Sequence, residues 1–506
     1  MYDELMNSGV LVVMFSFVAT LFSYGQNLGV DSFIGAGPLN NTISPGVSGG
    51  FIGAGHINTV SANNGGIAAG YGNNILAESR RSFIGSGASN TLNSTWHSFI
   101  GAGANNRIDS GSSNSCIVAG YGNLIDSNCP HSSIGGGYSN RIVTFSSSST
   151  IGGGAGNDAM GENATIGGGI GNLCESYAVV GGGLLNDASG TYSVVAGGRE
   201  NESSAESTFV GGGYGNKARQ SYSTIGGGLF NLSSGSYGTI GGGSDNINSG
   251  MKGTIGGGME NIIRGDYATI GGGWGNTNNG LYGTVSGGKY NRVDGNWAVV
   301  SGGISNVATA RNATIPGGSL NTVTNNGSFV WGDGSSATAS WADNTFTVRS
   351  IGGARFYTAA GTATGVRLAA RGTAWASLSD RASKQDFQPV DKREILKKVA
   401  DLPVTSWTYK TDLSRRYIGP MAQDFHSTFG LGDDDKSITT LDTDGVLLAS
   451  VQGLVEELQE RDRTMAWEKL QSASALAERD VEIEDLRKSL QELKTRVDSM
   501  SPPTSR

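Results

Sequence analysis

A period of about 15 residues in the apolar positions dominates the sequence. From Val210 to Val330 a β-branched residue returns every 15 positions, usually followed by glycines, as in "YSTIGGGLFNLSSGS" and "YGTIGGGSDNINSGM". Upstream, from Ile34 on, the same unit recurs at a looser spacing of 14 to 18 residues. Short-period repetition is the signature of a solenoid, in which each repeat forms one coil. The pattern therefore predicts a mainly β fold with a solenoid over residues 28–332.

A column of asparagines accompanies this period. An asparagine stands six residues after each of the first nineteen apolar anchors, beginning with Asn40, even where the spacing between anchors changes. In the regular part the column comprises Asn231, Asn246, Asn261, Asn276 and Asn291. Glycine permits positive φ, asparagine tolerates it, and stacked asparagines hydrogen-bond to one another. We therefore expect a parallel β-solenoid with an asparagine ladder inside it or at its corner, and with insertions confined to the other half of each coil.

A coil of 15 residues encloses a thin core that one chain can barely fill. Three coils side by side would bury the remaining apolar face, so we expect a homotrimeric shaft. The repeats resemble the β-roll heads of trimeric autotransporter adhesins and the Gly-rich stalks of phage-type fibres. This resemblance implies a surface protein whose partner is a cell-surface or glycan receptor.

Sharper interpretations of the repeats fit less well. Calcium-binding repeats have a period of nine with aspartate after the glycines. An ice-binding face needs paired threonine columns, but the residues two positions before Thr224 and Thr239 are Tyr222 and Tyr237. Glycine triplets arise by chance in such a chain, and none precedes a helical pattern as a nucleotide-binding loop does. We expect no metal and no cofactor.

Composition narrows the function classes further. Glycine supplies 83 of 506 residues without a Gly-X-Y triplet, which excludes collagen. The net charge of −8 offers no basic surface for nucleic acid. The three cysteines, Cys116, Cys129 and Cys174, have no metal-ligand spacing and are expected to be small buried residues.

The N-terminus carries an apolar run from Gly9 to Phe22, which has the length of a signal-peptide h-region rather than of a membrane span. The residues before it include Asp3 and Glu4 instead of a lysine or arginine, so translation from Met6 or Met14 and a membrane anchor both stay open. We expect residues 1–27 to be a signal peptide or anchor and the protein to be exported. It would then be extracellular or on the cell surface, with a virion tail fibre as the alternative.

The composition changes after residue 378, because 43 of the 78 charged residues follow this point. Residues 333–378 form an expected β-rich connector, and residues 379–446 have ordinary globular sequence. There "KREILKKVADLP" has one apolar helical face and ends at Pro403, "VTSWTY" alternates as a strand, and "MAQDFHSTFG" predicts a helix that ends at Gly430. A small α+β domain is expected.

The tail, residues 447–500, keeps one heptad register throughout. Its a and d positions are Leu448, Val451, Val455, Leu458, Asp462, Met465, Lys469, Ser472, Leu476, Arg479, Ile483, Leu486, Leu490, Leu493 and Val497. Both ends of this series are apolar and its middle is polar, and polar a/d residues help to fix register and oligomeric state. The tail is predicted to form a trimeric coiled coil.

Several separated motifs carry a family resemblance. "SDRASKQDFQPVD", "ILKKVADLPVTSWTYK", "RRYIGPMAQDFHSTFGLG" and "DTDGVLLASVQGLVEEL" occur in this order between about residues 379 and 458. They resemble the endosialidase-type C-terminal intramolecular chaperone, a self-cleaving serine peptidase domain. The resemblance implies trimerisation, assistance in fibre folding and cleavage between Leu378 and Ser379, with Ser379 as the nucleophile and Lys384 as its base partner.

Other residues near these motifs have expected supporting roles. Asp380 is expected to orient the turn rather than to perform chemistry, and His426 is a weaker catalytic candidate. The chain has Ser383 and Tyr417 where the family often has leucine and histidine, which puts cleavage rather than folding assistance in question. The competing hypothesis is a non-cleaving fibre whose C-terminal domain is only a trimerisation module. A glycosidase fibre is not supported, because paired carboxylates do not stand out among the repeats.

Overall fold

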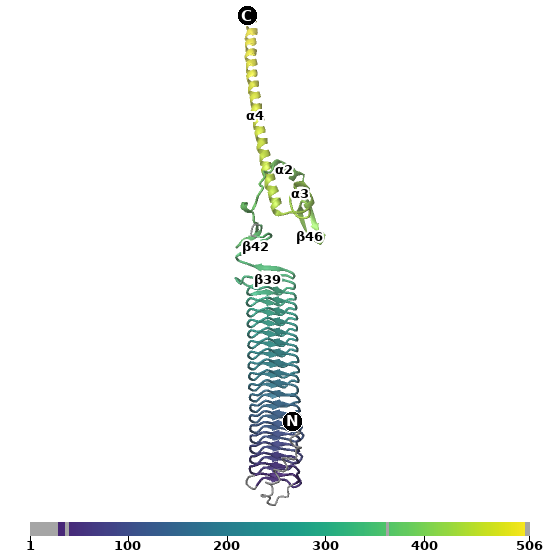
Figure 1. Cartoon of the computed structure of the whole chain (residues 1–506). Helices are drawn as coiled ribbons and strands as arrows, with labels where there is room; N and C mark the ends of the chain where they lie inside the picture. Colours follow the sequence, from purple (N-terminus) through teal and green to yellow (C-terminus); the bar gives the residue numbers. More distant parts are fainter. Residues whose placement is uncertain (1–28, 36–39, 361–363, 501–506) are drawn as a thin grey trace. The chain divides into compact units, whose positions relative to one another are not determined.

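The chain folds into two compact units, residues up to Ile351 and residues from Gly352 on. The computed structural model describes residues 29–35, 40–360 and 364–500. The first unit is a stack of β coils, and the second contains small sheets and helices (Figure 1). The predicted signal or anchor segment, with its apolar run Gly9–Phe22, lies outside the described residues.

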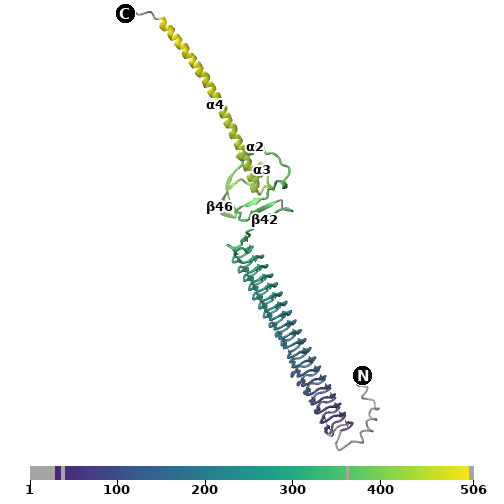
Figure 2. The same ribbon diagram turned by 90° about the vertical axis from the view of Figure 1, so that its left-hand side faces the viewer.

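Each coil of the first unit contributes one strand to each of two sheets. The odd-numbered strands, from β1 (Phe33–Ile34) to β41 (Phe346–Arg349), form a 21-stranded sheet. The even-numbered strands, from β2 (Thr42–Ile43) to β40 (Thr338–Ala339), form the other. The coils are broad in Figure 1 and narrow in the perpendicular view of Figure 2, so each coil is flattened. The prediction of a mainly β chain with a parallel β-solenoid is confirmed.

The strands pair in parallel with the equivalent strand of the next coil. For example, β25 (Thr224–Ile225) pairs with β27 (Thr239–Ile240) so that Ile225 lies beside Ile240. Nearly all strands have two residues, one pointing outward and one buried. The spacing of the apolar anchors in the sequence is therefore the length of one coil.

The core of the solenoid closes within one chain. The anchors Ile225 and Ile240 are fully buried, and so are inward residues of the even-numbered strands such as Ile263 and Val293. Burial of one such side chain contributes about 2 kcal/mol, repeated at every coil. The expectation that one chain can barely fill the coil is wrong, because the inward residues of both strands are fully buried in the single chain. The size of the core therefore does not by itself require three chains.

The ladder asparagines lie inside the solenoid and join successive coils. Asn246 donates from its backbone N–H and from Nδ2 to Oδ1 of Asn231, at 3.1 and 3.0 Å. Its Nδ2 also donates to the carbonyl oxygens of Gly242 and Gly258, at 3.0 and 2.9 Å. Both asparagines are fully buried. Most coils repeat these buried amide contacts, which satisfy backbone carbonyls, mostly of glycine, beside the corner.

Two details of the asparagine column differ from the expectation. Asn40 is exposed and contacts His56, whereas Asn41 is buried and occupies the ladder position below Asn58. The extra residue falls before the second strand of that coil. The ladder asparagines also do not adopt positive φ; the preceding residue does, as at Phe230 with φ 53° and Asp245 with φ 56°. The ladder asparagine's role is therefore hydrogen bonding and not backbone freedom.

A second corner of each coil also uses the left-handed conformation. Tyr222, Tyr237, Tyr267 and Tyr282 stand there with φ between 55° and 64°. A non-glycine residue pays about 1 kcal/mol for this conformation. Stacking of neighbouring rings accompanies it, with centroids 4.7 Å apart for both Tyr222–Tyr237 and Tyr267–Tyr282. The stacking between coils thus stabilises a left-handed conformation that a tyrosine without such neighbours would not favour.

The second unit begins with an antiparallel sheet. Its strands are β42 (Gly353–Tyr357), β43 (Gly365–Ala369) and β44 (Trp375–Ser377), paired in that order. The parallel stack of the first unit continues past residue 332, because β41 pairs in parallel with β39 (Phe329–Gly332). The expected connector, residues 333–378, is thus divided between the two units.

The elements predicted for the C-terminal domain are present. Helix α2 (Lys392–Asp401) is followed by a hairpin of β45 (Thr405–Tyr409) and β46 (Asp412–Gly419). Helix α3 (Ala422–Phe429) ends at Gly430, whose φ of 67° is the left-handed C-cap conformation. The N-cap of α2 is Asp391, whose carboxylate accepts from two backbone N–H groups of the first turn.

One long helix, α4 (Thr440–Ser499), completes the unit. Near its start it packs on α2 through ion pairs Lys392–Glu456 and Arg393–Glu460, at 3.1 Å for the first. Gly453 makes this approach close, since a Cβ there would lie 2.3 Å from the Lys392 carbonyl oxygen. Within the described ranges, none of the helices combines the length and apolarity that a bilayer span requires.

Candidate functional site

The structure places Ser379 and Lys384 in direct contact. Strand β44 ends at Ser377, and after Leu378 and Ser379 the chain forms a short 3-10 helix, η2 (Arg381–Ser383). This single turn brings the lysine back onto the serine, so that Lys384 Nζ donates to Ser379 Oγ at 2.5 Å. A hydroxyl and an amine at hydrogen-bond distance are the elements of a serine–lysine dyad.

The turn between the two residues is held by local hydrogen bonds. The carboxylate of Asp380 accepts from the backbone N–H of Ala382 at 2.9 Å and so caps η2. Ser383 Oγ donates to the carbonyl of Asp380 at 2.8 Å. Asp380 is therefore directed at the backbone of its own turn, and its carboxylate has a geometric role in keeping Lys384 beside Ser379.

The residue before the serine is anchored to the sheet of β42 to β44. The N–H of Leu378 donates to the carbonyl of Gly365 at 3.0 Å, which extends the antiparallel pairing of β43 with β44 by one residue. The bond between Leu378 and Ser379 thus lies where the strand ends and the turn begins. The chain before this bond is fixed by the sheet, and the nucleophile candidate is fixed by the turn after it.

Both side chains of the pair are exposed in the single chain. The amine is the donor in the observed contact, whereas a lysine that takes a proton from serine must be neutral, a state that burial favours. The arrangement can position a hydroxyl beside the Leu378–Ser379 bond.

The weaker candidates contact other parts of the domain. Tyr417 stacks on Trp407 with ring centroids 4.9 Å apart, and His426 Nδ1 lies 2.8 Å from the Leu431 carbonyl oxygen, where it helps to close the end of α3. Within the described residues, neither side chain hydrogen-bonds to Ser379. The structure does not bring these two residues into the dyad.

Sequence reasoning missed two residues that shape the site. Gly365 holds Leu378 through a backbone contact between strands, for which the sequence has no local signal. Arg381 lies over the ring of Phe387, 4.7 Å from its centroid, and spans the turn that contains Lys384. An arginine and a phenylalanine six residues apart could have indicated this contact only if the intervening turn were known.

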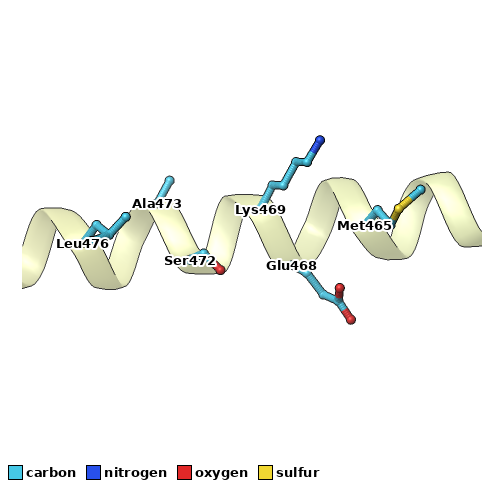
Figure 3. A pocket seen from close by; sticks show the side chains of 6 residues that line it. All are labelled: Met465, Glu468, Lys469, Ser472, Ala473 and Leu476. Atoms are coloured by element: carbon cyan, nitrogen blue, oxygen red, sulfur yellow. The ribbon is translucent and has the colours of Figure 1, made fainter.

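A separate hollow lies along α4, and the residues that line it are Met465, Glu468, Lys469, Ser472, Ala473 and Leu476 (Figure 3). All six belong to one helix, and four of them are predicted a or d positions. The hollow is therefore an uncovered face of the helix rather than an enclosed ligand pocket. In the described part of the chain, no group of three or more His, Cys, Asp or Glu residues is arranged to hold a metal ion.

Comparison with known families identifies the region that contains this site. Residues 379–430 match the family model described as chaperone of endosialidase, and a long β-solenoid precedes them. The match begins at Ser379 and includes Lys384, Tyr417 and His426, and it confirms the resemblance found in the motifs. The search of curated proteins finds no match for the chain.

Proposed function

We propose that this chain, a β-solenoid shaft with an endosialidase-chaperone domain behind it, is a homotrimeric fibre or adhesin-like surface protein. The domain drives folding of the trimer and then cuts itself off between Leu378 and Ser379. The observation that carries the cleavage is the contact of Lys384 Nζ with Ser379 Oγ at 2.5 Å, at the first residue of the matched region.

The proposed reaction is a single self-directed turnover. Lys384, in its neutral form, takes the proton of Ser379 Oγ, which attacks the carbonyl carbon of Leu378. The bond from this carbon to the Ser379 nitrogen breaks, and the nitrogen takes the proton from Lys384. An ester then joins Leu378 to Ser379 Oγ. Water hydrolyses this ester and leaves the carboxyl group of Leu378 and the free amine and hydroxyl of Ser379.

Trimerisation supplies what the single chain lacks at this site. Cover by neighbouring chains would exclude water, and burial favours the neutral form of a lysine. Cleavage would then follow assembly instead of preceding it. Once the domain that assisted folding is released, the shaft can no longer unfold by the reverse of the path by which it folded. The finished shaft is therefore trapped kinetically.

Helix α4 is the proposed trimerisation element. Its predicted core positions are exposed in the single chain, with Leu448 65%, Leu486 63% and Leu490 71% exposed. Such a row of exposed apolar side chains along one helix is stable in water when other helices cover it. We propose a three-stranded coiled coil over residues 447–500, which joins the chains before the long β pairings form.

The proposed location is outside the cell or on a virion, as for fibre proteins with this type of chaperone. The shaft would bind a cell-surface or glycan receptor. No catalytic activity on other substrates is proposed.

The test is mass spectrometry of the chain as expressed, with Ser379→Ala, Lys384→Ala and the control Ser427→Ala. We expect the wild type and Ser427→Ala to yield a fragment that begins at Ser379, and the other two variants to stay intact. Ser427 is a suitable control because its hydroxyl donates to the Asp424 carbonyl within α3 and not in the turn that holds Ser379 and Lys384. Intact chains in all four proteins would remove the peptidase proposal.

That result would favour the second candidate function, a fibre in which the domain only holds three chains together. The observation in its favour is Tyr417, which stacks on Trp407 in place of the histidine often found in the family. Sedimentation equilibrium of Ser379→Ala then tests whether the chains assemble. A trimer supports assembly through the domain, and a monomer contradicts both candidate functions.

A further inference from the structure

The two outer faces of the solenoid differ in charge. The first residues of the odd-numbered strands form a column of 21 positions that contains Phe, Val, Thr, Ser, Cys and Gly and no charged residue. The residue after each two-residue strand of this sheet adds a second column, mostly glycine with alanine, serine, valine and a proline, which is also uncharged. We call these two columns the uncharged face.

The opposite face carries charged residues. Seven of the even-numbered strands begin with a charged residue, among them Arg141, Glu202 and Arg292. Charged side chains of this face form ion pairs within the chain, such as Arg219 with Glu202 at 2.9 Å and Arg292 with Asp294 at 2.8 Å. Several charges of this face are therefore paired within one chain, which suits the face to water. The uncharged face has no such adaptation.

Large apolar side chains are exposed on the uncharged face. Phe83 and Phe99 stack with centroids 6.2 Å apart and are 38% and 40% exposed, and Phe209 is 39% exposed. Single exposed apolar residues are ordinary, but several of them on a strip without charge along a whole domain make that strip a candidate interaction surface.

The size of this strip fits an interface between proteins. The 21 strands, stacked about 4.8 Å apart, span roughly 100 Å, and a strip of three residues is about 10 Å wide. The area is therefore on the order of 1,000 Å² per chain, which a trimer divides between two neighbours, against about 800 Å² per partner in a stable two-protein interface. An identical chain in parallel register presents the same strip over the same length, because both shafts have the same coil rise.

We infer that the uncharged face is the surface through which the shafts of the other copies of this chain pack, while the charged face stays in water. This inference rests on the proposed trimer and adds to it the face that is buried. It also gives the exposed phenylalanines a partner, since the same rows meet at the same height in every chain. The small residues of the second column let the backbones approach closely.

The test compares two threonines that differ only in the face that they occupy. Thr254 is the outward residue of β29 (Thr254–Ile255) on the uncharged face, and Thr277 is that of β32 (Thr277–Asn278) on the charged face. In the single chain Thr254 is exposed and Thr277 is half-buried. If the shaft is uncovered, a thiol introduced at position 254 should react faster than one at position 277. If other chains cover the uncharged face, the thiol at position 254 should react more slowly.

Thr254→Cys and Thr277→Cys are made in the full chain with Cys116→Ser, because Cys116 itself lies on the uncharged face. The rate of reaction with a maleimide is measured on the native and on the unfolded protein, together with the mass in solution. We expect a trimer in which the thiol of Thr254→Cys reacts an order of magnitude more slowly than that of Thr277→Cys, and equal rates after unfolding.

A trimer in which Thr254→Cys reacts at least as fast as Thr277→Cys would overturn the inference and leave the proposed trimer intact, held by its C-terminal part. A monomer would overturn the trimer as well. Fast reaction that slows only after a polysaccharide or ice is added would assign the face to that ligand and also contradict packing between copies.

Discussion

Removal of one ladder asparagine is the most informative perturbation of the shaft. Asn261 donates from Nδ2 to Asn246 Oδ1, Gly257 O and Gly273 O, at 3.1, 3.0 and 2.9 Å. Its Oδ1 accepts from the backbone N–H and from Nδ2 of Asn276, both at 3.1 Å. Asn261→Ala deletes all of these contacts and leaves the buried N–H of Asn276 without its acceptor.

The expected cost follows from these five contacts. Each intramolecular hydrogen bond contributes a net value of about 1 kcal/mol, and an orphaned buried donor costs about 1–3 kcal/mol. Some of the lost acceptors stay satisfied, since the Gly273 carbonyl also accepts from the N–H of Met259. We expect Asn261→Ala to destabilise the coils around it by roughly 4 kcal/mol. Because each coil contacts only its neighbours, the loss stays local.

The assay is native-state hydrogen exchange followed by mass spectrometry. Peptides that contain Asn261 to Asn276 should exchange up to about a thousandfold faster, since 1.4 kcal/mol is a factor of ten. Coils far along the shaft should keep their rates. The matched control is Asn296→Ala, an exposed asparagine whose Oδ1 accepts one backbone N–H, from Leu281 at 3.1 Å.

Equal protection in Asn261→Ala and wild type would refute the reasoning, and so would an equal loss in Asn296→Ala. Asn261→Asp sharpens the test because it keeps the shape of the side chain and replaces the two N–H donors of the amide by at most one O–H donor, present only when the carboxyl group is neutral. A buried carboxyl group favours its neutral form, so folding raises its pKa. The stability of this variant should therefore fall as pH rises through that pKa.

Three further predictions concern other parts of the chain. Gly453→Ala should cost the C-terminal unit about 1–3 kcal/mol of unfolding free energy, because the added methyl group overpacks against α2, and so should lower its melting temperature. Gly445→Ala on the same helix is the control: its methyl group meets nothing within 4 Å, so it should stabilise the helix. The hydrogen bond from Arg219 lowers the pKa of Glu202. The pair therefore contributes to the unfolding free energy at neutral pH, by less than about 1 kcal/mol, and this contribution is lost as pH falls through the lowered pKa. Arg219→Gln should flatten this acid dependence in denaturant titrations. Burial raises the pKa of the Cys174 thiol to about 11, so a maleimide should modify it only after unfolding, and modification of the native shaft would contradict the buried position.

The candidate site was predictable in part. The resemblance of the motifs to a known family predicted Ser379 and Lys384, and the structure brings the two together through a single turn that Asp380 caps from within the same segment. Tyr417 and His426 belong to a hairpin and a helix further along the chain. Their neighbours, Trp407 and the Leu431 carbonyl, depend on packing that no local pattern encodes.

The sequence by itself determined the repeating unit of the shaft. A buried isoleucine at one fixed position and an asparagine six residues later define where each coil turns, since both are local requirements for an apolar core and for satisfied glycine carbonyls. It also determined the helices α2, α3 and α4, whose apolar spacing and caps lie within single segments. Periodicity along the chain is enough for these elements.

Only the tertiary structure decided how the coils close and which faces they expose. In some coils the inward residue of the second strand is as small as Ala218 or Ser233, which no apolar pattern marks as a core position. The shift from Asn40 to Asn41 and the placing of the left-handed residue before each asparagine depend on contacts with the next coil. These features need atoms from neighbouring repeats at once, so they are fixed by stacking and not by the local sequence.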